Sequence, residues 1–232
     1  MNIRSAWIIR INRWSTKLFR FEVEQMCVFE NLALSRGYRM ISGIDEAGRG
    51  ALAGPVIAAC VMLNQENIPS GIVDSKKISN ARRRELFHAI KETALSIGIG
   101  IAGPEIIDEV NIYNATKIAM KKALDNMTVK PDFLLIDAVK LYDISISALS
   151  INKGEDRSVS IAAASIIAKV YRDNIMIDLS GKYPLYGFSS HKGYGTSLHR
   201  ESLFQYGPTE VHRYSYKPVA KVHEIWKLKK QR

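Results

Sequence analysis

The chain has 232 residues, long enough for one sizeable hydrophobic core and too short to require two full domains. Hydrophobic residues make up 47% and charged residues 24% of it, which is typical of a folded protein and excludes a chain that is disordered throughout. The 33 lysines and arginines outnumber the 23 acids, and this excess fits either a well-solvated surface or a polyanionic partner such as nucleic acid.

The first twenty residues are basic, and no acid precedes Glu22. An arginine-rich, acid-free start is typical of an organellar transit peptide. A loosely ordered extension and a start codon assigned too far upstream are the alternatives, and we favour these two because the segment is short and poor in serine. Whether residues 1–20 belong to the mature protein stays open.

Strands gather early in the chain and then alternate with helices, which predicts a mixed α/β sheet layered with helices. Apolar runs predict strands over 38–44, 55–63, 97–102, 133–136 and 144–151. Helical spacing predicts helices over 21–35, 115–126, 158–179 and 196–206. Asn80 is expected to cap a further helix that runs to about Ala94, and Pro104 is expected in the first turn of a short helix. Alanines 162–164 would let the long helix approach the sheet closely. Glycine and proline predict a loop over 183–194, and the lysine-rich end predicts a frayed tail.

The only two cysteines, Cys27 and Cys60, exclude a disulfide framework and a cysteine-rich zinc site. Both lie in apolar surroundings and are expected to be small core residues. No apolar run reaches the ~20 residues that cross a bilayer. These features fit a protein of the reducing cytoplasm.

Two adjacent acids, Asp45 and Glu46, end an apolar strand. Neighbouring carboxylates raise each other's pKa unless a cation compensates, and Mg²⁺ binds carboxylate oxygens directly. Consecutive strand residues point to opposite faces, so both acids can meet one ion only if the strand ends or bends, which Gly48 and Gly50 permit. A strand that simply ends in polar turn residues is the alternative. A dinucleotide-binding loop is a poor second choice, because Gly54 comes one residue too late for that motif.

Asp137 emerges from a second apolar strand, where a lone carboxylate is costly without a partner. It is therefore the best candidate to converge with the first pair, and three acids suit two metal ions that flank a phosphate. Asp173 is interpreted instead as a helix-surface charge that pairs with Lys169.

These motifs, in this order, resemble the ribonuclease HII family, in its bacterial branch, over about residues 21–218. The matching segments are 43–50, 53–56, 74–77, 114–116, Asp137, 163–170 and 191–194. The resemblance implies a ribonuclease H-like fold, with a central mixed β-sheet flanked by helices and a small C-terminal helical part. The chain would then divide into a basic extension over 1–20, a catalytic domain over 21–218 and a basic tail over 219–232.

By the same resemblance, Asp45, Glu46 and Asp137 would be catalytic acids that bind Mn²⁺ or Mg²⁺. The family usually has an aspartate as the fourth acid, in Lys-Gly-Asp, where this chain has Glu155. Glu155 could reach the ion with its longer side chain, or Asp156 could take the place by a local shift. Both alternatives stay open.

The resemblance also implies a set of substrate-binding residues: Gly48, Arg49, Gly50, Lys76, Lys77 and Tyr194. The first three would line the minor groove near the ribonucleotide 2′-OH, the group that distinguishes RNA from DNA. Tyr194 would stack at the RNA–DNA junction, although an aromatic ring between glycines is more often a packed loop residue. Lys76 and Lys77 would place the phosphate backbone without reading sequence, and a solvated loop is an equal alternative for them.

The implied function is an endonuclease that hydrolyses the RNA strand of RNA–DNA hybrids and nicks DNA duplexes 5′ of single embedded ribonucleotides. The mechanism would use two metal ions, and the protein would act as a monomer. A non-catalytic basic nucleic-acid-binding protein is one rival, and the acids argue against it because unpaired carboxylates repel phosphates. Another metal nuclease of the same fold, such as a resolvase, is the second rival, and it would ignore the 2′-OH.

Overall fold

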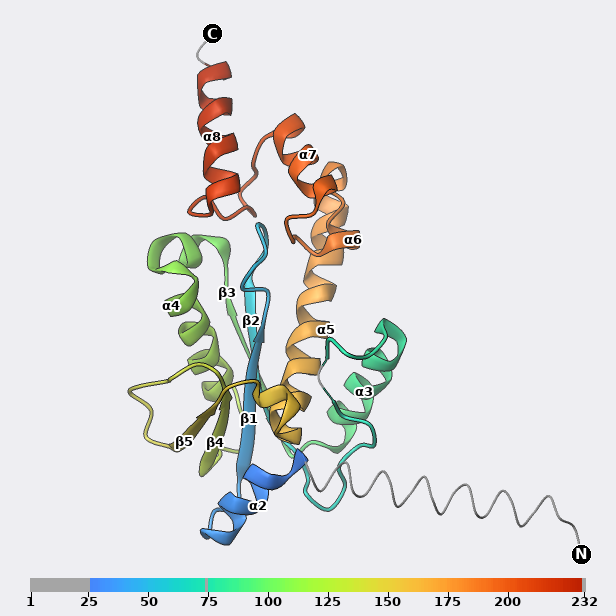
Figure 1. The fold of residues 1–232 in the computed structure, drawn as a ribbon, viewed down its shortest axis with the longest axis vertical. Helices are drawn as coiled ribbons and strands as arrows, with labels where there is room; N and C mark the ends of the chain where they lie inside the picture. The colour runs from blue at the N-terminus through green and yellow to red at the C-terminus, as the bar shows by residue number, and fades with distance from the viewer. Residues whose placement is uncertain (1–25, 74, 231–232) are drawn as a thin grey trace, which may run out of the picture.

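A five-stranded mixed sheet forms the centre of the protein, in the order β3-β2-β1-β4-β5 (Figure 1). The computed structural model describes residues 26–73 and 75–230, so the basic start and Asp74 lie outside the described residues. The strands are β1 (Ile41–Ala47), β2 (Val56–Met62), β3 (Ser96–Ala102), β4 (Phe133–Asp137) and β5 (Ser147–Ile151). The pairs β1–β2 and β2–β3 are antiparallel, whereas β1–β4 and β4–β5 are parallel. The predicted mixed α/β sheet is confirmed.

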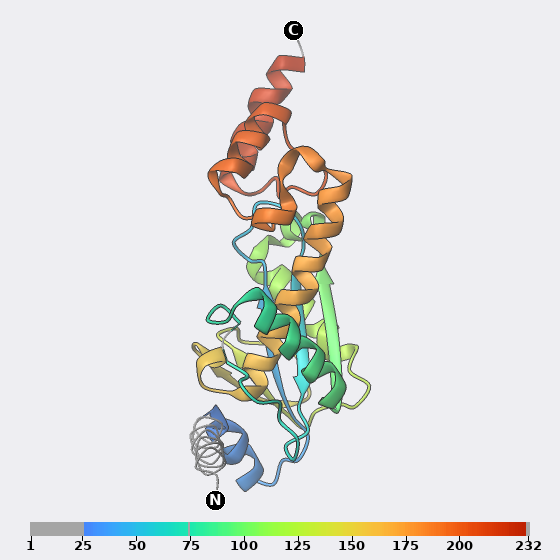
Figure 2. The same ribbon diagram turned by 90° about the vertical axis from the view of Figure 1, so that its right-hand side faces the viewer.

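Helices cover both faces of this sheet. They are α2 (Val28–Ser35), α3 (Asn80–Thr93), α4 (Pro104–Asp125), α5 (Val159–Lys182), α6 (Phe188–His191), α7 (Ser197–Tyr206) and α8 (Lys217–Lys230), with short 3-10 turns η1 (Gly154–Asp156) and η2 (Pro184–Tyr186). Helix α4 lies on one face, and α5 lies on the other with α3 outside it. The last three helices gather beyond the β1–β2 connection (Figures 1 and 2). None of the helices within the described ranges is long and apolar enough to cross a membrane.

Small residues let α5 pack directly on β1. A side chain at Gly43 would collide with the backbone of Ser160, and the alanines at 162–164 are fully buried. Two apolar layers result, one between the sheet and α4 and one between the sheet and α5 with α3. Cys60 lies in the first layer and Cys27 in the second, both as buried free thiols, as predicted. The sheet edge that carries the acids is therefore held rigidly from both sides.

Several predicted boundaries in the first part of the chain are wrong. Strand β1 begins at Ile41 and continues through Ala47, so both adjacent acids lie inside the strand. The cap of α3 is Ser79, whose side chain accepts from the Arg82 amide, and Asn80 is the first helical residue. The two helices expected between residues 104 and 126 are both present within α4, but the non-helical residue that separates them is Asn111, with φ of 66°, so the second helix begins earlier than the expected residue 115. The Asn111 side chain accepts hydrogen bonds from the amides of Tyr113 and Asn114 and thereby caps the second helical part of α4.

The C-terminal part is also more regular than predicted. The loop expected over 183–194 contains η2 and α6, because Tyr186 and Phe188 are buried and fix its path. The expected tail over 219–232 is helical to the end of α8. Apolar residues explain this helix, since Val219 is fully buried and the Trp226 indole donates to the Phe204 carbonyl at 3.2 Å. The tail was predicted from the lysines of this segment, whereas its apolar residues at helical spacing determine the structure.

Candidate active site

Two parallel strands bring the first acids to one edge of the sheet. Ile44 on β1 lies opposite Ile136 on β4, so Asp45 and Asp137 follow at the same level. The carboxyl ends of parallel neighbours meet at one edge, and this is where ligands of such sheets are bound. The Gly154 amide, in the turn after β5, donates to Asp137 at 2.7 Å. Three separate segments therefore converge on this edge.

Burial and mutual repulsion raise the pKa values of these acids. Asp45 is only 4% exposed, and burial raises its pKa well above the usual range, with Glu46 and Asp137 adding repulsion. Burial also raises the pKa of Glu46, although Arg49 opposes this shift from 3.2 Å. Burial raises the pKa of Asp137 to about 6. Raised pKa values of this kind arise where buried carboxylates converge, and they mark candidate functional sites.

The structure places Glu155, and not Asp156, beside the other acids. Burial alone would raise the pKa of Glu155, but its backbone hydrogen bond and Lys76, 3.2 Å away, lower it overall. Glu155 in turn contributes to the raised pKa of Asp137. Asp156 instead pairs with Lys77 on the more exposed side of the turn. Lys76 thus belongs to the acidic cluster, and Lys77 lies outside it.

The four acids have the chemistry of a hard-cation site. One carboxylate oxygen each of Glu46 and Glu155 is buried and has no hydrogen-bond partner among the described residues. A buried unpartnered carboxylate oxygen is costly, and a divalent cation would satisfy it. Within the described ranges no three acid, histidine or thiol groups already stand together as a ligand set. Each acid accepts instead from a protein donor, such as Arg49, Lys76 or the Gly154 amide.

A tight loop follows the acids on β1. Gly48 has φ of +98°, and a side chain there would collide with the buried Arg172, so the position requires glycine. Gly50 is exposed, its φ is not left-handed, and a side chain there would meet no atom within 4 Å. Neither space nor backbone conformation within the protein therefore requires glycine at Gly50.

Tyr194 lies next to this loop. The Leu52 amide donates to the Gly193 carbonyl at 2.8 Å and joins the two segments. The Tyr194 ring is 38% exposed and packs over the Arg172 guanidinium at 5.3 Å. The structure thus brings the predicted loop residues and Tyr194 together on one surface, with the ring open to a partner.

Two buried arginines organise this surface, and neither was predicted from the sequence. Arg172 on α5 donates to the carbonyls of Ala53, Pro55 and Lys192, and Arg213 donates to carbonyls of the loop after β1. One signal existed for Arg172, because it shares a fully buried face of α5 with residues four positions away on each side. No sequence signal singled out Arg213.

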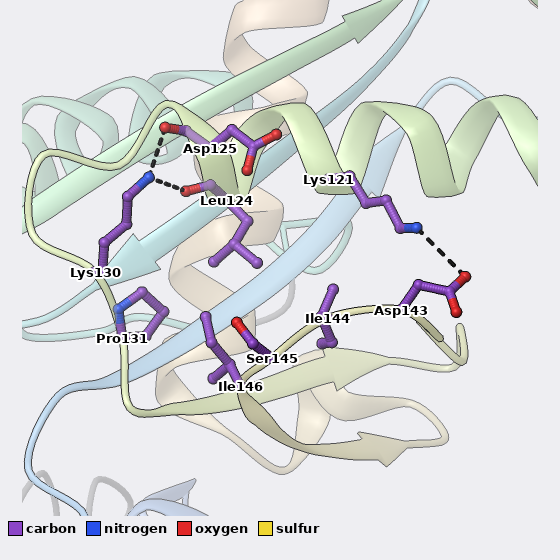
Figure 3. A pocket seen from close by; sticks show the side chains of 9 residues that line it. All are labelled: Lys121, Leu124, Asp125, Lys130, Pro131, Asp143, Ile144, Ser145 and Ile146. Atoms are coloured by element: carbon purple, nitrogen blue, oxygen red, sulfur yellow. Dashed lines mark hydrogen bonds and ion pairs between the residues drawn. The ribbon is translucent and has the colours of Figure 1, made fainter.

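Two further features lie outside this cluster. Asp173 pairs with Lys169 at 2.6 Å on the surface of α5, as predicted. A cavity of about 470 Å³ lies between the end of α4 and the β4–β5 connection (Figure 3). Lys121 and Asp143 face each other at its rim, and Lys130 donates to carbonyls at the end of α4. None of the four acids lines it, so it is separate from the candidate active site.

Comparisons with known proteins agree with this geometry. The family model for ribonuclease HII matches residues 42–219. The ribonuclease HII of Acetivibrio thermocellus is 51% identical over 211 residues, covering 89% of this chain and 82% of the relative. That of Bacillus subtilis is 49% identical over 194 residues, covering 84% and 76%. Among solved structures, ribonuclease H2 from Pyrococcus horikoshii has a TM-score of 0.70 at 24% identity over 82% of this chain and 99% of its own. RNase HII from Archaeoglobus fulgidus, solved with PCNA, has a TM-score of 0.66 at 27% identity over 77% and 96%.

Proposed function

Since the chain belongs to the ribonuclease HII family of endoribonucleases, we propose that it hydrolyses the RNA strand of RNA–DNA hybrids and nicks DNA 5′ of single embedded ribonucleotides. The observation that supports this most is the convergence of Asp45, Glu46, Asp137 and Glu155 at one sheet edge. Buried acids in that number repel one another and the phosphate unless cations join them. Their arrangement therefore favours cation-dependent phosphodiester chemistry over simple binding of a polyanion.

Divalent cations, Mn²⁺ or Mg²⁺, are the cofactors of this proposal. Asp45, Glu46 and Asp137 would hold them, with Glu155 as the fourth acid. When bound, two such ions would lower the pKa of the attacking water and stabilise the leaving 3′ oxygen. The protein itself positions these groups, through the Gly154 amide on Asp137 and the Ser165 hydroxyl on Asp45.

The loop after β1 and Tyr194 would bind the substrate. The absence of a side chain at Gly50 leaves room for close approach of a nucleic-acid strand, and nothing inside the protein requires it. Backbone groups that reach the ribose 2′-OH would separate RNA from DNA. Tyr194, with its ring supported by Arg172, suits stacking on a base or sugar. Arg49 and Lys76 would contact phosphates beside the acids, and Lys77 would do so from the exposed side.

Cleavage of an end-labelled DNA duplex with one ribonucleotide tests the proposal, with Mg²⁺, Mn²⁺ or EDTA and with an all-DNA control. We expect a metal-dependent nick on the 5′ side of the ribonucleotide and an intact control. Cleavage of the all-DNA control would indicate another nuclease of this fold. Tight binding without a nick in either metal would indicate a binding protein.

Glu155 should behave as the fourth acid and Asp156 should not. Glu155→Gln removes a charge that faces Asp137 and Glu46, so we expect kcat to fall by about 10- to 100-fold. Asp156→Asn is the matched control next to it. It breaks only an exposed pair with Lys77, so kcat should stay within about twofold. Steady-state cleavage at saturating metal measures both, and a larger loss in Asp156→Asn would reverse the assignment.

A further inference from the structure

Arg213 is buried in the segment between α7 and α8 and uses every N–H of its guanidinium. Nη2 donates to the carbonyls of Gly48 at 2.8 Å and Gly54 at 2.9 Å, and Nε donates to Gly54 at 3.0 Å. Nη1 donates to the carbonyl of Arg49 at 2.9 Å and to the Tyr216 hydroxyl at 3.1 Å. The side chain is 0% exposed, and its hydrogen-bond partners are carbonyl and hydroxyl oxygens rather than carboxylates.

Burying a cation whose hydrogen-bond partners are all uncharged oxygens is costly, so a buried arginine at this position needs a reason. Apolar packing of the same volume would join the two segments without burying a charge. A guanidinium has a fixed planar fork of five donors, and it can fix several carbonyls in defined directions at once. Here the guanidinium holds the carbonyls of two successive peptide groups, the one that follows Gly48 and the one that follows Arg49.

Holding these carbonyls also aims the amides. In a planar trans peptide the C=O and N–H groups point in opposite directions. The carbonyls of Gly48 and Arg49 point inward to Arg213, so the N–H groups of Arg49 and Gly50 point away from it. Both residues are exposed, and neither amide donates to any other described residue. The Tyr216 hydroxyl reinforces the arrangement by donating to the Arg49 carbonyl at 2.6 Å.

We propose that Arg213 is a positioning residue that aims the Arg49 and Gly50 amides at the ribose, and thereby sets the preference for a ribonucleotide over a deoxyribonucleotide. This inference rests on the proposed function. Two adjacent N–H donors in a fixed direction can hydrogen-bond the 2′-OH oxygen or its neighbouring phosphate oxygen. A deoxyribonucleotide leaves one of them without a partner, which is a strong basis for discrimination.

The test compares Arg213→Lys with the wild type in binding and in cleavage. Lysine keeps the charge but loses the planar fork, so the two carbonyls are no longer both fixed. We measure Kd without metal for a duplex with one ribonucleotide and for the all-DNA duplex. The preference for the ribonucleotide should fall about tenfold, with all-DNA affinity unchanged. In cleavage, KM for the ribonucleotide duplex should rise more than kcat falls, which a merely structural role would not produce.

Two other variants separate positioning from folding. Asp108→Asn is the control. The Asp108 carboxylate accepts hydrogen bonds from the amides of Tyr214 and Ser215, so it anchors the segment that contains Arg213 without contacting the loop carbonyls. The variant should keep the ribonucleotide preference. Tyr216→Phe removes the hydroxyl that donates to the Arg49 carbonyl and accepts from Arg213, and it leaves the guanidinium in place. It should lower the preference in the same direction by a smaller factor even if Arg213→Lys does not fold.

Three outcomes would overturn the inference. They are an unchanged preference in folded Arg213→Lys, an unchanged preference in Tyr216→Phe where Arg213→Lys does not fold, and an equal loss in Asp108→Asn. Failure of the proposed function looks different, because the wild-type protein itself would then neither prefer nor cut the ribonucleotide duplex.

Discussion

Asp45→Asn should abolish cleavage while the protein still binds RNA–DNA hybrid in part. Asp45 is the most buried of the four clustered acids, and its carboxylate is repelled by those of Glu46 and Asp137. In the proposed mechanism, removing its charge takes away a cation ligand at the centre of the cluster. A bound metal supplies several kcal/mol of transition-state stabilisation, so a loss of about 4 kcal/mol, or roughly 10³-fold in rate, is expected. Single-turnover cleavage at saturating enzyme measures this loss. A normal cleavage rate for the variant would contradict the assignment of Asp45 to the active site.

The same substitution should not weaken the fold when metal is absent. The Asp45 carboxylate is buried beside two other acids, and its pKa is raised, so its charge opposes folding near neutral pH. Asparagine keeps the shape and can still accept the Glu46 amide. We expect a thermal midpoint in EDTA at or above that of the wild type. A variant that is inactive because it is unfolded would show a clear drop instead, so this measurement is the control for the kinetic one.

The sequence was sufficient to locate the acids because they follow apolar runs. Asp137 directly follows four apolar residues, and a strand that ends in an acid indicates a sheet edge. The number of strands, the mixed sheet and the two buried cysteines were predictable for the same reason. The end of β1 was not, because Asp45 and Glu46 interrupt the apolar pattern while pairing in the ladder with Ala59 and Ala58. Tertiary pairing overrides local polarity there.

The fourth acid and the organising arginines depend on contacts between distant parts of the chain. The turn η1 places Glu155 beside Asp137 and directs Asp156 toward Lys77, whereas sequence spacing alone allowed either acid to lie beside Asp137. Arg213 lies more than 150 positions from the carbonyls that it binds. Every residue has a backbone carbonyl, so an arginine that donates to carbonyls has no partner that can be recognised from its residue type. Such residues become visible only when the backbone partners are located.

The second large expected effect is on stability, and it comes from a buried histidine pair behind Tyr194. His199 donates from Nδ1 to the Tyr194 carbonyl at 3.0 Å, and its Nε2 lies 3.2 Å from Nε2 of His212. The Thr209 amide donates to Nδ1 of His212, so His212 carries its proton on Nε2 and donates to His199. Every ring nitrogen is satisfied with both rings neutral. Burial lowers the pKa of His199 to about 4 and that of His212 to about 3.

These lowered pKa values make the pair a source of stability that is lost in acid. The unfolded histidines take up protons as pH falls through about 6.5, while the folded ones stay neutral. Stability from the pair is therefore complete above pH ~6.5 and falls as pH decreases toward the folded values, by about 2 kcal/mol for each histidine between pH 7 and 5. The acids near Asp137 act in the opposite direction, because their raised pKa values favour the folded state as pH falls.

The contribution of the acids is the same in the wild type and in a histidine variant, so it cancels when their unfolding free energies are compared at the same pH. His212→Gln should be less stable than the wild type at pH 7.5, and the difference in unfolding free energy should narrow by about 2 kcal/mol by pH 5, because the variant no longer excludes that proton. His88→Gln, on the exposed surface of α3, is the matched control for losing an imidazole outside a buried site, and its unfolding free energy at pH 7.5 should stay within about 0.5 kcal/mol of the wild type. Urea unfolding in EDTA at a series of pH values measures all three proteins. A difference for His212→Gln that does not change with pH would contradict the prediction, because it would mean that His212 takes up a proton as readily in the folded protein as in the unfolded chain.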